Sequence, residues 1–152
     1  PEIFFDFLKI LFQKIFIPHQ VYIDVVVAGR ARAGEKEVNE AIKETWLEVI
    51  EIKEKDKVER LKRDWKIHQG EAEAIVLAQN LSASRLLTDD NEAVLRARGL
   101  KITVIRTPGI FLLAKRERLI PTVKENIDHL IEEGYWMTEE EYKNVLRGAN
   151  EP

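Results

Sequence analysis

The stretch RLLTDDNEAVLRARGLKITVIR, residues 85–106, decides the fold class. It opens with a short apolar run, continues with two aspartates and a helical pattern that ends at Gly99, and closes with the β-branched run 101–106. Strand-like runs on both sides of a helical pattern are typical of parallel strands joined by a crossover helix. We therefore predict strands at 85–88 and 101–106 with a helix between them.

The same alternation extends along the rest of the chain. Further strands are predicted at 14–18 and 47–52, and helices at 2–13, from Pro18 to Gly29, and at 35–46, 55–66, 70–81, 108–118, 121–134 and 138–147. Strands that alternate with helices predict an α/β sandwich with a parallel sheet. The length of 152 residues fits a single domain spanning residues 1–152.

Composition limits the function classes. With 34% charged residues and a net charge of -3, the chain is not a globally basic nucleic-acid binder, although a local basic patch is compatible with it. The absence of cysteine excludes a disulfide framework and thiolate metal sites, which fits a cytoplasmic protein. No run of 18 apolar residues is present, so we predict no membrane span. The apolar start of the chain lacks the features of a signal peptide.

Two adjacent aspartates, Asp89 and Asp90, follow the strand at 85–88. Aspartate is a preferred N-cap, and Glu92 lies three residues after Asp89, which predicts a capping box for the next helix. One helix start needs only one capping carboxylate. The second aspartate therefore needs a further explanation.

Acids from other segments are predicted to reach the same place. Ligands of a parallel sheet lie beyond the carboxyl ends of its strands, and Glu71, at the start of the helix 70–81, should approach that edge. Asp24, inside the apolar run YIDVVV, should lie near it too. Hard oxygen ligands without cysteine suit Mg²⁺ or Mn²⁺. Taken singly, each acid also has a structural interpretation, and Glu73 is predicted to be a solvated helix residue.

The motifs HQGEAEAIVLAQNL and RLLTDDNEAVLRARGLKITVIRTPGIFLLAKRERLI together resemble the PIN-domain proteins, in particular the small prokaryotic nucleases related to VapC toxins. The segment IPHQVYIDVVV and the tail GYWMTEEEYKNVL are also similar to this family. The residues that carry the resemblance are Gly70, Glu71, Ala74, Ile75, Asp89, Asp90, Thr107, Gly109 and Ile110.

The resemblance implies a three-layer α/β/α sandwich and a metal-dependent ribonuclease, a hydrolase of RNA phosphodiester bonds. Carried over by position, Asp24, Glu71 and Asp90 are the catalytic acids. These three and Asp89 are the implied ligands of Mg²⁺ or Mn²⁺. Thr88 is implied to help orient these ligands through its hydroxyl group without binding the metal itself. The family is often dimeric, and its toxin members are held by an antitoxin. A homodimer and an antitoxin partner are therefore expected.

The chain departs from the family pattern at its start. The family opens with a central strand that ends in Asp-Thr-Ser and supplies a principal metal ligand, whereas this sequence starts at Pro1, about where that motif would have ended. We therefore expect a PIN-like domain that is truncated at its N-terminus and lacks the first central strand. This favours a second hypothesis, an inactive PIN-like module that binds RNA or a protein partner. A receiver-like domain is a third and weaker alternative.

Phosphate contacts with RNA need lysine or arginine near the acids. The predicted residues are Arg30, Arg32 and Arg106. Trp46, Trp65 and Trp136 have apolar neighbours at helical or strand spacing. We predict that the tryptophans serve a core or an interface and do not stack on bases.

Overall fold

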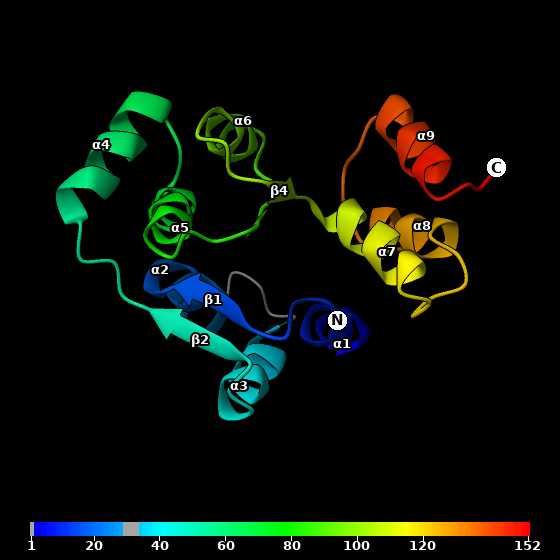
Figure 1. The fold of residues 1–152 in the computed structure, drawn as a ribbon, viewed down its shortest axis with the longest axis horizontal. Coiled ribbons are helices and arrows are strands. Elements are labelled where there is room, and N and C mark those ends of the chain that lie inside the picture. The colour runs from blue at the N-terminus through cyan, green and yellow to red at the C-terminus, as the bar shows by residue number, and fades with distance from the viewer. Residues whose placement is uncertain (1, 29–33) are drawn as a thin grey trace. The chain divides into compact units, whose positions relative to one another are not determined.

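The computed structural model describes residues 2–28 and 34–152. The chain divides into two compact units, unit 1 from Pro1 to Ile105 and unit 2 from Arg106 to Pro152. Figure 1 shows the elements of both units. Within the described residues, no helix combines the length and the apolar character that crossing a bilayer requires.

Unit 1 alternates helices and strands, as the sequence predicts. Its elements in chain order are α1 (Glu2–Phe12), β1 (Ile15–Pro18), α2 (His19–Tyr22), the π-helix η1 (Ile23–Val27), α3 (Glu35–Lys43), β2 (Leu47–Ile50), α4 (Lys55–Trp65), α5 (Gln69–Asn80), β3 (Leu86–Leu87), α6 (Asn91–Gly99) and β4 (Val104–Ile105). The predicted helix from Pro18 to Gly29 is present from His19 to Val27, as α2 followed by η1, whereas Pro18 ends β1.

The four strands of the described residues form two separate parallel pairs. In the first pair Ile15 of β1 lies opposite Leu47 of β2, and in the second Leu86 of β3 lies opposite Val104 of β4. Parallel strands and covering helices confirm the α/β fold. No strand of the described residues joins β1 to β3.

The second strand pair is shorter than predicted. Only 86–87 and 104–105 pair as strands, although the predicted strands are 85–88 and 101–106. Two backbone bonds flank the pair, from Leu86 N–H to the Thr103 carbonyl and from Thr88 N–H to the Ile105 carbonyl. The β3–β4 ladder is therefore limited to two residues on each strand.

Helix α5 is the centre of unit 1. It packs against β1, α2, α4, β3 and α6, several of which surround it in Figure 1. Its buried residues are Gly70, Ala72, Glu73, Ile75, Val76, Leu77 and Ala78. A helix that is apolar on most sides is buried by its neighbours. The contact of α5 with α2 includes a hydrogen bond between Gln20 and Glu73.

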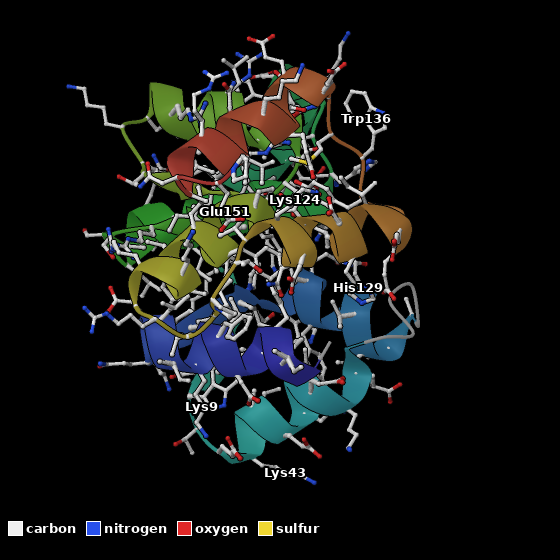
Figure 2. All side chains as sticks on the ribbon, turned by 90° about the vertical axis from the view of Figure 1, so that its right-hand side faces the viewer. Lys9, Lys43, Lys124, His129, Trp136 and Glu151 are labelled. Carbon is white, nitrogen blue, oxygen red and sulfur yellow. The ribbon has the colours of Figure 1, made fainter. Side chains whose placement is uncertain are left out.

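A second apolar cluster fixes α1 and α3 on the first strand pair. Trp46 is buried at 8% exposure with Ala41 and Leu47, and its ring meets the edge of Phe5 at a centroid distance of 6.4 Å. The prediction of a core tryptophan is confirmed for Trp46. Trp136 differs, because 76% of it is exposed; Figure 2 shows its ring projecting from the segment between α8 and α9.

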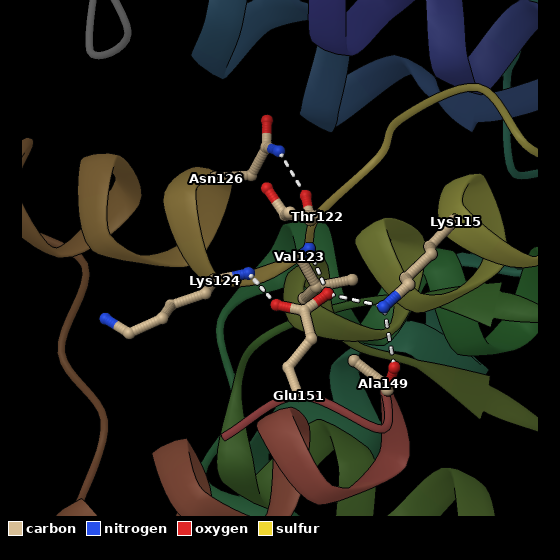
Figure 3. Close-up of polar contacts among 7 residues, drawn as sticks. All are labelled: Lys115, Thr122, Val123, Lys124, Asn126, Ala149 and Glu151. Carbon is tan, nitrogen blue, oxygen red and sulfur yellow. Dashed lines mark hydrogen bonds and ion pairs between the residues drawn. The ribbon is translucent and has the colours of Figure 1, made fainter.

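Unit 2 consists of α7 (Thr107–Arg116), α8 (Lys124–Glu132) and α9 (Glu139–Gly148). The predicted helix 121–134 therefore starts three residues late. Val123 precedes α8 and has no side chain that could cap it, and the carboxylate of Glu151 takes that place: its oxygens accept from Val123 N–H at 2.7 Å and Lys124 N–H at 2.8 Å (Figure 3). Lys115 donates to the same carboxylate at 2.7 Å. The start of α8 is thus set by a distant residue.

A polar triad joins α8 to α9. The Tyr142 hydroxyl donates to Asp128 at 2.6 Å, and Lys124 Nζ donates to the other Asp128 oxygen at 2.8 Å. Hydrogen bonds with Asp128 first, and with Tyr142 second, raise the pKa of Lys124 above its ordinary value. The same bonds from Lys124 and Tyr142 lower the pKa of Asp128.

Candidate functional site

Asp24 lies in the π-helix η1, directly after the short helix α2. A π-helix has a wider turn than an α-helix and is found frequently at functional sites. The side chain of Asp24 is half-buried, and its Oδ1 accepts a hydrogen bond from Gln20 Nε2 at 3.0 Å. This bond between neighbouring helical turns holds the carboxylate in one orientation.

The other oxygen of Asp24 reaches the first turn of α5. A Cβ placed on Gly70 would lie 3.5 Å from Asp24 Oδ2 and 3.4 Å from Val21 Cγ2. Because Gly70 has no side chain, residue 70 does not cover Asp24 Oδ2. Glu71 is the residue after Gly70. The structure therefore places Asp24 near the start of α5, where Glu71 lies, as the sequence predicts.

Glu71 has a carboxylate oxygen that is buried without a hydrogen-bond partner. This atom is Oε2, and no described residue donates to it. A buried polar atom without a partner costs free energy, so it needs an explanation in a native structure. A carboxylate oxygen in this state fits a divalent cation that prefers oxygen ligands, such as Mg²⁺ or Mn²⁺.

Asp90 is the N-cap of α6. Its Oδ1 accepts from Ala93 N–H at 2.7 Å, and its own N–H donates to Thr88 Oγ1 at 3.3 Å. The predicted capping box on Asp89 is wrong: the capping residue is Asp90, and Glu92 binds Arg96, with Oε1 2.7 Å from Nη2. Asp89 is exposed and has a polar contact of its own.

The predicted acids are not gathered in one cluster. Across residues 2–28 and 34–152, no group of three His, Asp or Glu side chains is arranged so that it could hold a metal ion. Asp24 reaches the start of α5, whereas Asp90 is engaged at the start of α6. A shared metal site for Asp24, Glu71, Asp89 and Asp90 therefore stays a prediction.

Glu73 is a buried acid near Asp24 that sequence reasoning missed. It is buried at 3% exposure; its Oε2 accepts from Gln20 N–H at 3.2 Å and its Oε1 accepts from Gln69 Nε2 at 3.0 Å. The prediction of a solvated residue is wrong. A signal was present in the sequence, because Glu73 precedes the buried Val76 and Leu77 by three and four residues, which places it on their helix face.

Comparison with protein families identifies the chain. A family model described as PIN domain matches residues 4–151. The chain belongs to the PIN-domain family. This confirms the resemblance and agrees with the α/β fold, and PIN-domain proteins are generally nuclease-related. Neither the curated proteins nor the solved structures contain a match. The narrower relation to VapC toxins stays a prediction.

The arginines predicted to contact RNA in this PIN domain cannot all be placed. Arg30 and Arg32 lie outside the described residues. Arg106 is half-buried directly before α7, in unit 2. The pKa of Glu141 is lowered by the backbone and side-chain hydrogen bonds with Thr138, and the charge of Arg106 adds to this effect. A role in RNA binding stays a prediction for all three arginines.

Proposed function

We propose that this PIN domain is a metal-dependent endoribonuclease that hydrolyses phosphodiester bonds of RNA. The observation that supports it is the arrangement at the first turn of α5, where the Asp24 carboxylate lies against Gly70 and the adjacent Glu71 has a buried oxygen without a described partner. Two carboxylates on neighbouring segments repel each other unless a cation lies between them or one takes up a proton.

In this proposal Asp24, Glu71 and Asp90 are the catalytic acids, and Asp89 is a fourth ligand for Mg²⁺ or Mn²⁺. When bound, such an ion would activate water and stabilise the charge that develops on phosphate. Asp90 uses Oδ1 as the cap of α6, and Thr88 fixes its backbone.

The remaining parts of the proposal concern substrate and partners. Arg30, Arg32 and Arg106 contact RNA phosphates, since phosphate binding needs cationic side chains. The protein acts in the cytoplasm as a homodimer, and as a toxin it is held by an antitoxin protein.

The test is Mn²⁺ binding by calorimetry, followed by cleavage of labelled RNA in the presence of Mg²⁺. The variants are Asp24→Asn, Glu71→Gln and Asp90→Asn, and the matched control is Asp6→Asn, because Asp6 is an exposed aspartate of α1. We expect each site variant to weaken binding and cleavage by about tenfold or more, and the control to leave both unchanged. Equal effects of control and site variants would refute the site.

A second function is supported by the local bonds of Asp90. Since its Oδ1 accepts from Ala93 N–H, Asp90 serves the fold even without a ligand. An inactive PIN-like module that holds RNA or a protein partner is compatible with this arrangement. In that case RNA binds without being cut, and the three site variants leave RNA binding unchanged.

A further inference from the structure

Glu73 and Gln20 connect the buried side of α5 to the Asp24 carboxylate. The backbone N–H of Gln20 donates to Glu73 Oε2 at 3.2 Å, and the side-chain amide of Gln20 donates to Asp24 Oδ1 at 3.0 Å. One residue therefore bonds with both acids, through different groups.

The hydrogen bonds run in sequence from the first turn of α5 to Asp24. Gln69 of α5 donates to Glu73 at 3.0 Å, Glu73 accepts from Gln20, and Gln20 donates to Asp24. Asp24 Oδ2 then returns to α5, 3.5 Å from where a Cβ of Gly70 would lie. Gln20 thus links Asp24 to Glu73, and Asp24 Oδ2 lies beside the first turn of α5.

The burial of Glu73 depends on these hydrogen bonds. A glutamate at 3% exposure is costly unless its oxygens are hydrogen-bonded, and both oxygens of Glu73 are. Helix α2 follows Pro18, which offers no side-chain cap, and Glu73 supplies the missing acceptor. Any shift of α2 along α5 would break the bond of Glu73 with Gln20 and move Asp24.

We propose that Gln20 is the positioning residue of the Asp24 carboxylate, and that buried Glu73 fixes Gln20 in that position. The inference rests on the proposed function in one respect, namely that Asp24 binds a divalent cation. Residues that hydrogen-bond a ligating carboxylate orient it, and their loss costs metal affinity although they never touch the ion.

The decisive variant is Gln20→Leu in the full chain. Leucine removes the amide that binds Asp24 and keeps the backbone N–H that binds Glu73, so the start of α2 is preserved. The matched control is Gln79→Leu, because Gln79 is an exposed glutamine of α5. We expect Gln20→Leu to weaken Mn²⁺ binding about tenfold, with an unchanged thermal midpoint, and the control to bind like the parent chain.

A second measurement reads the hydrogen bond without metal. In a ¹⁵N-labelled chain, the side-chain amide resonances of Gln20 should move on Asp24→Leu, whereas those of Gln79 should not. Glu73→Gln completes the set: it should weaken Mn²⁺ binding and also lower the thermal midpoint, because it disturbs both Gln20 and Gln69.

The outcomes separate this inference from the proposed function. A parent chain that binds no Mn²⁺ overturns both. A parent chain that binds Mn²⁺ while Gln20→Leu binds equally well overturns the positioning role alone. The positioning role is also overturned if the side-chain amide resonances of Gln20 do not move in the Asp24→Leu variant. Weakened binding with an unchanged thermal midpoint, together with shifted amide resonances, supports it.

Discussion

Helices α6 and α2 both begin just after a strand, but the carboxylates that cap them come from different distances. At α6 the cap is Asp90, the residue before the helix, which accepts from Ala93 N–H at 2.7 Å. At α2 the residue before the helix is Pro18, and the acceptor is Glu73, 53 residues from Gln20 in the chain. A local cap stabilises one helix start, whereas a remote cap also ties two segments together.

Unit 2 repeats the contrast. Thr138 and Glu141 form a capping box at the start of α9, within three residues of each other. The start of α8 is bonded instead to Glu151, which lies 27 residues beyond Lys124. Remote caps should therefore cost more to remove than local caps, because each one also holds a tertiary contact.

The largest effect is expected for Glu73→Leu. Leucine fills a similar volume but leaves Gln20 N–H and the Gln69 amide without their acceptor in a partly buried place. Each unsatisfied donor costs roughly 1–3 kcal/mol, so we expect the free energy of unfolding to fall by about 3 kcal/mol. Urea unfolding followed by circular dichroism measures it.

The control for Glu73 is Glu40→Ala. Glu40 has a side chain that is 54% exposed, in an ion pair of 3.8 Å with Lys36. Exposed pairs of this kind contribute at most about 0.5 kcal/mol. If Glu73→Leu lowered the free energy of unfolding no more than Glu40→Ala does, the remote cap of α2 would not contribute to stability.

Glu151→Ala should have the next largest effect. Burial opposes the ionisation of Glu151, but Lys115 and the N–H groups of Val123 and Lys124 outweigh it and hold its pKa below the ordinary value of 4.5. Only 9% of this side chain is exposed. Hydrogen bonds of charged groups contribute roughly 1.5–3 kcal/mol, so we expect a loss of about 2 kcal/mol near neutral pH.

The sign of the pH dependence follows from the lowered pKa. A carboxyl whose pKa is lower in the folded chain stabilises it above the unfolded pKa, and this contribution is lost as pH falls through the folded value. The difference in the free energy of unfolding between the parent chain and Glu151→Ala should therefore stay constant from about pH 7 to about pH 5 and shrink as the pH falls below 4.5. A difference that stays constant below pH 4.5 as well would contradict the ionised cap.

The same contrast explains what the sequence could predict. Helical spacing and local turn chemistry predict most helices, the parallel strands and the presence of a cap at α6, because their causes lie within a few residues. They could not predict that Glu73 accepts a hydrogen bond from Gln20 or that α8 starts at Lys124, because the partners, Gln20 and Glu151, are distant in the chain. For the candidate site, the sequence predicted the approach of Asp24 to α5, but not the residues that hold it there.

The smallest effects are expected at the local cap of α6. Asp90→Ala removes the acceptor of Ala93 N–H and should cost about 1 kcal/mol in urea unfolding. Asp90→Asn keeps an acceptor of equal capping quality, so its cost should be close to zero. Because Asn keeps the cap and removes the charge, any loss of Mn²⁺ binding in this variant arises from the charge and not from the fold. If Asp90→Asn lowered the free energy of unfolding as much as Asp90→Ala does, the charge of Asp90 would itself stabilise the fold. Asp90 would then be more than a local cap of α6, and the comparison of local with remote caps would fail.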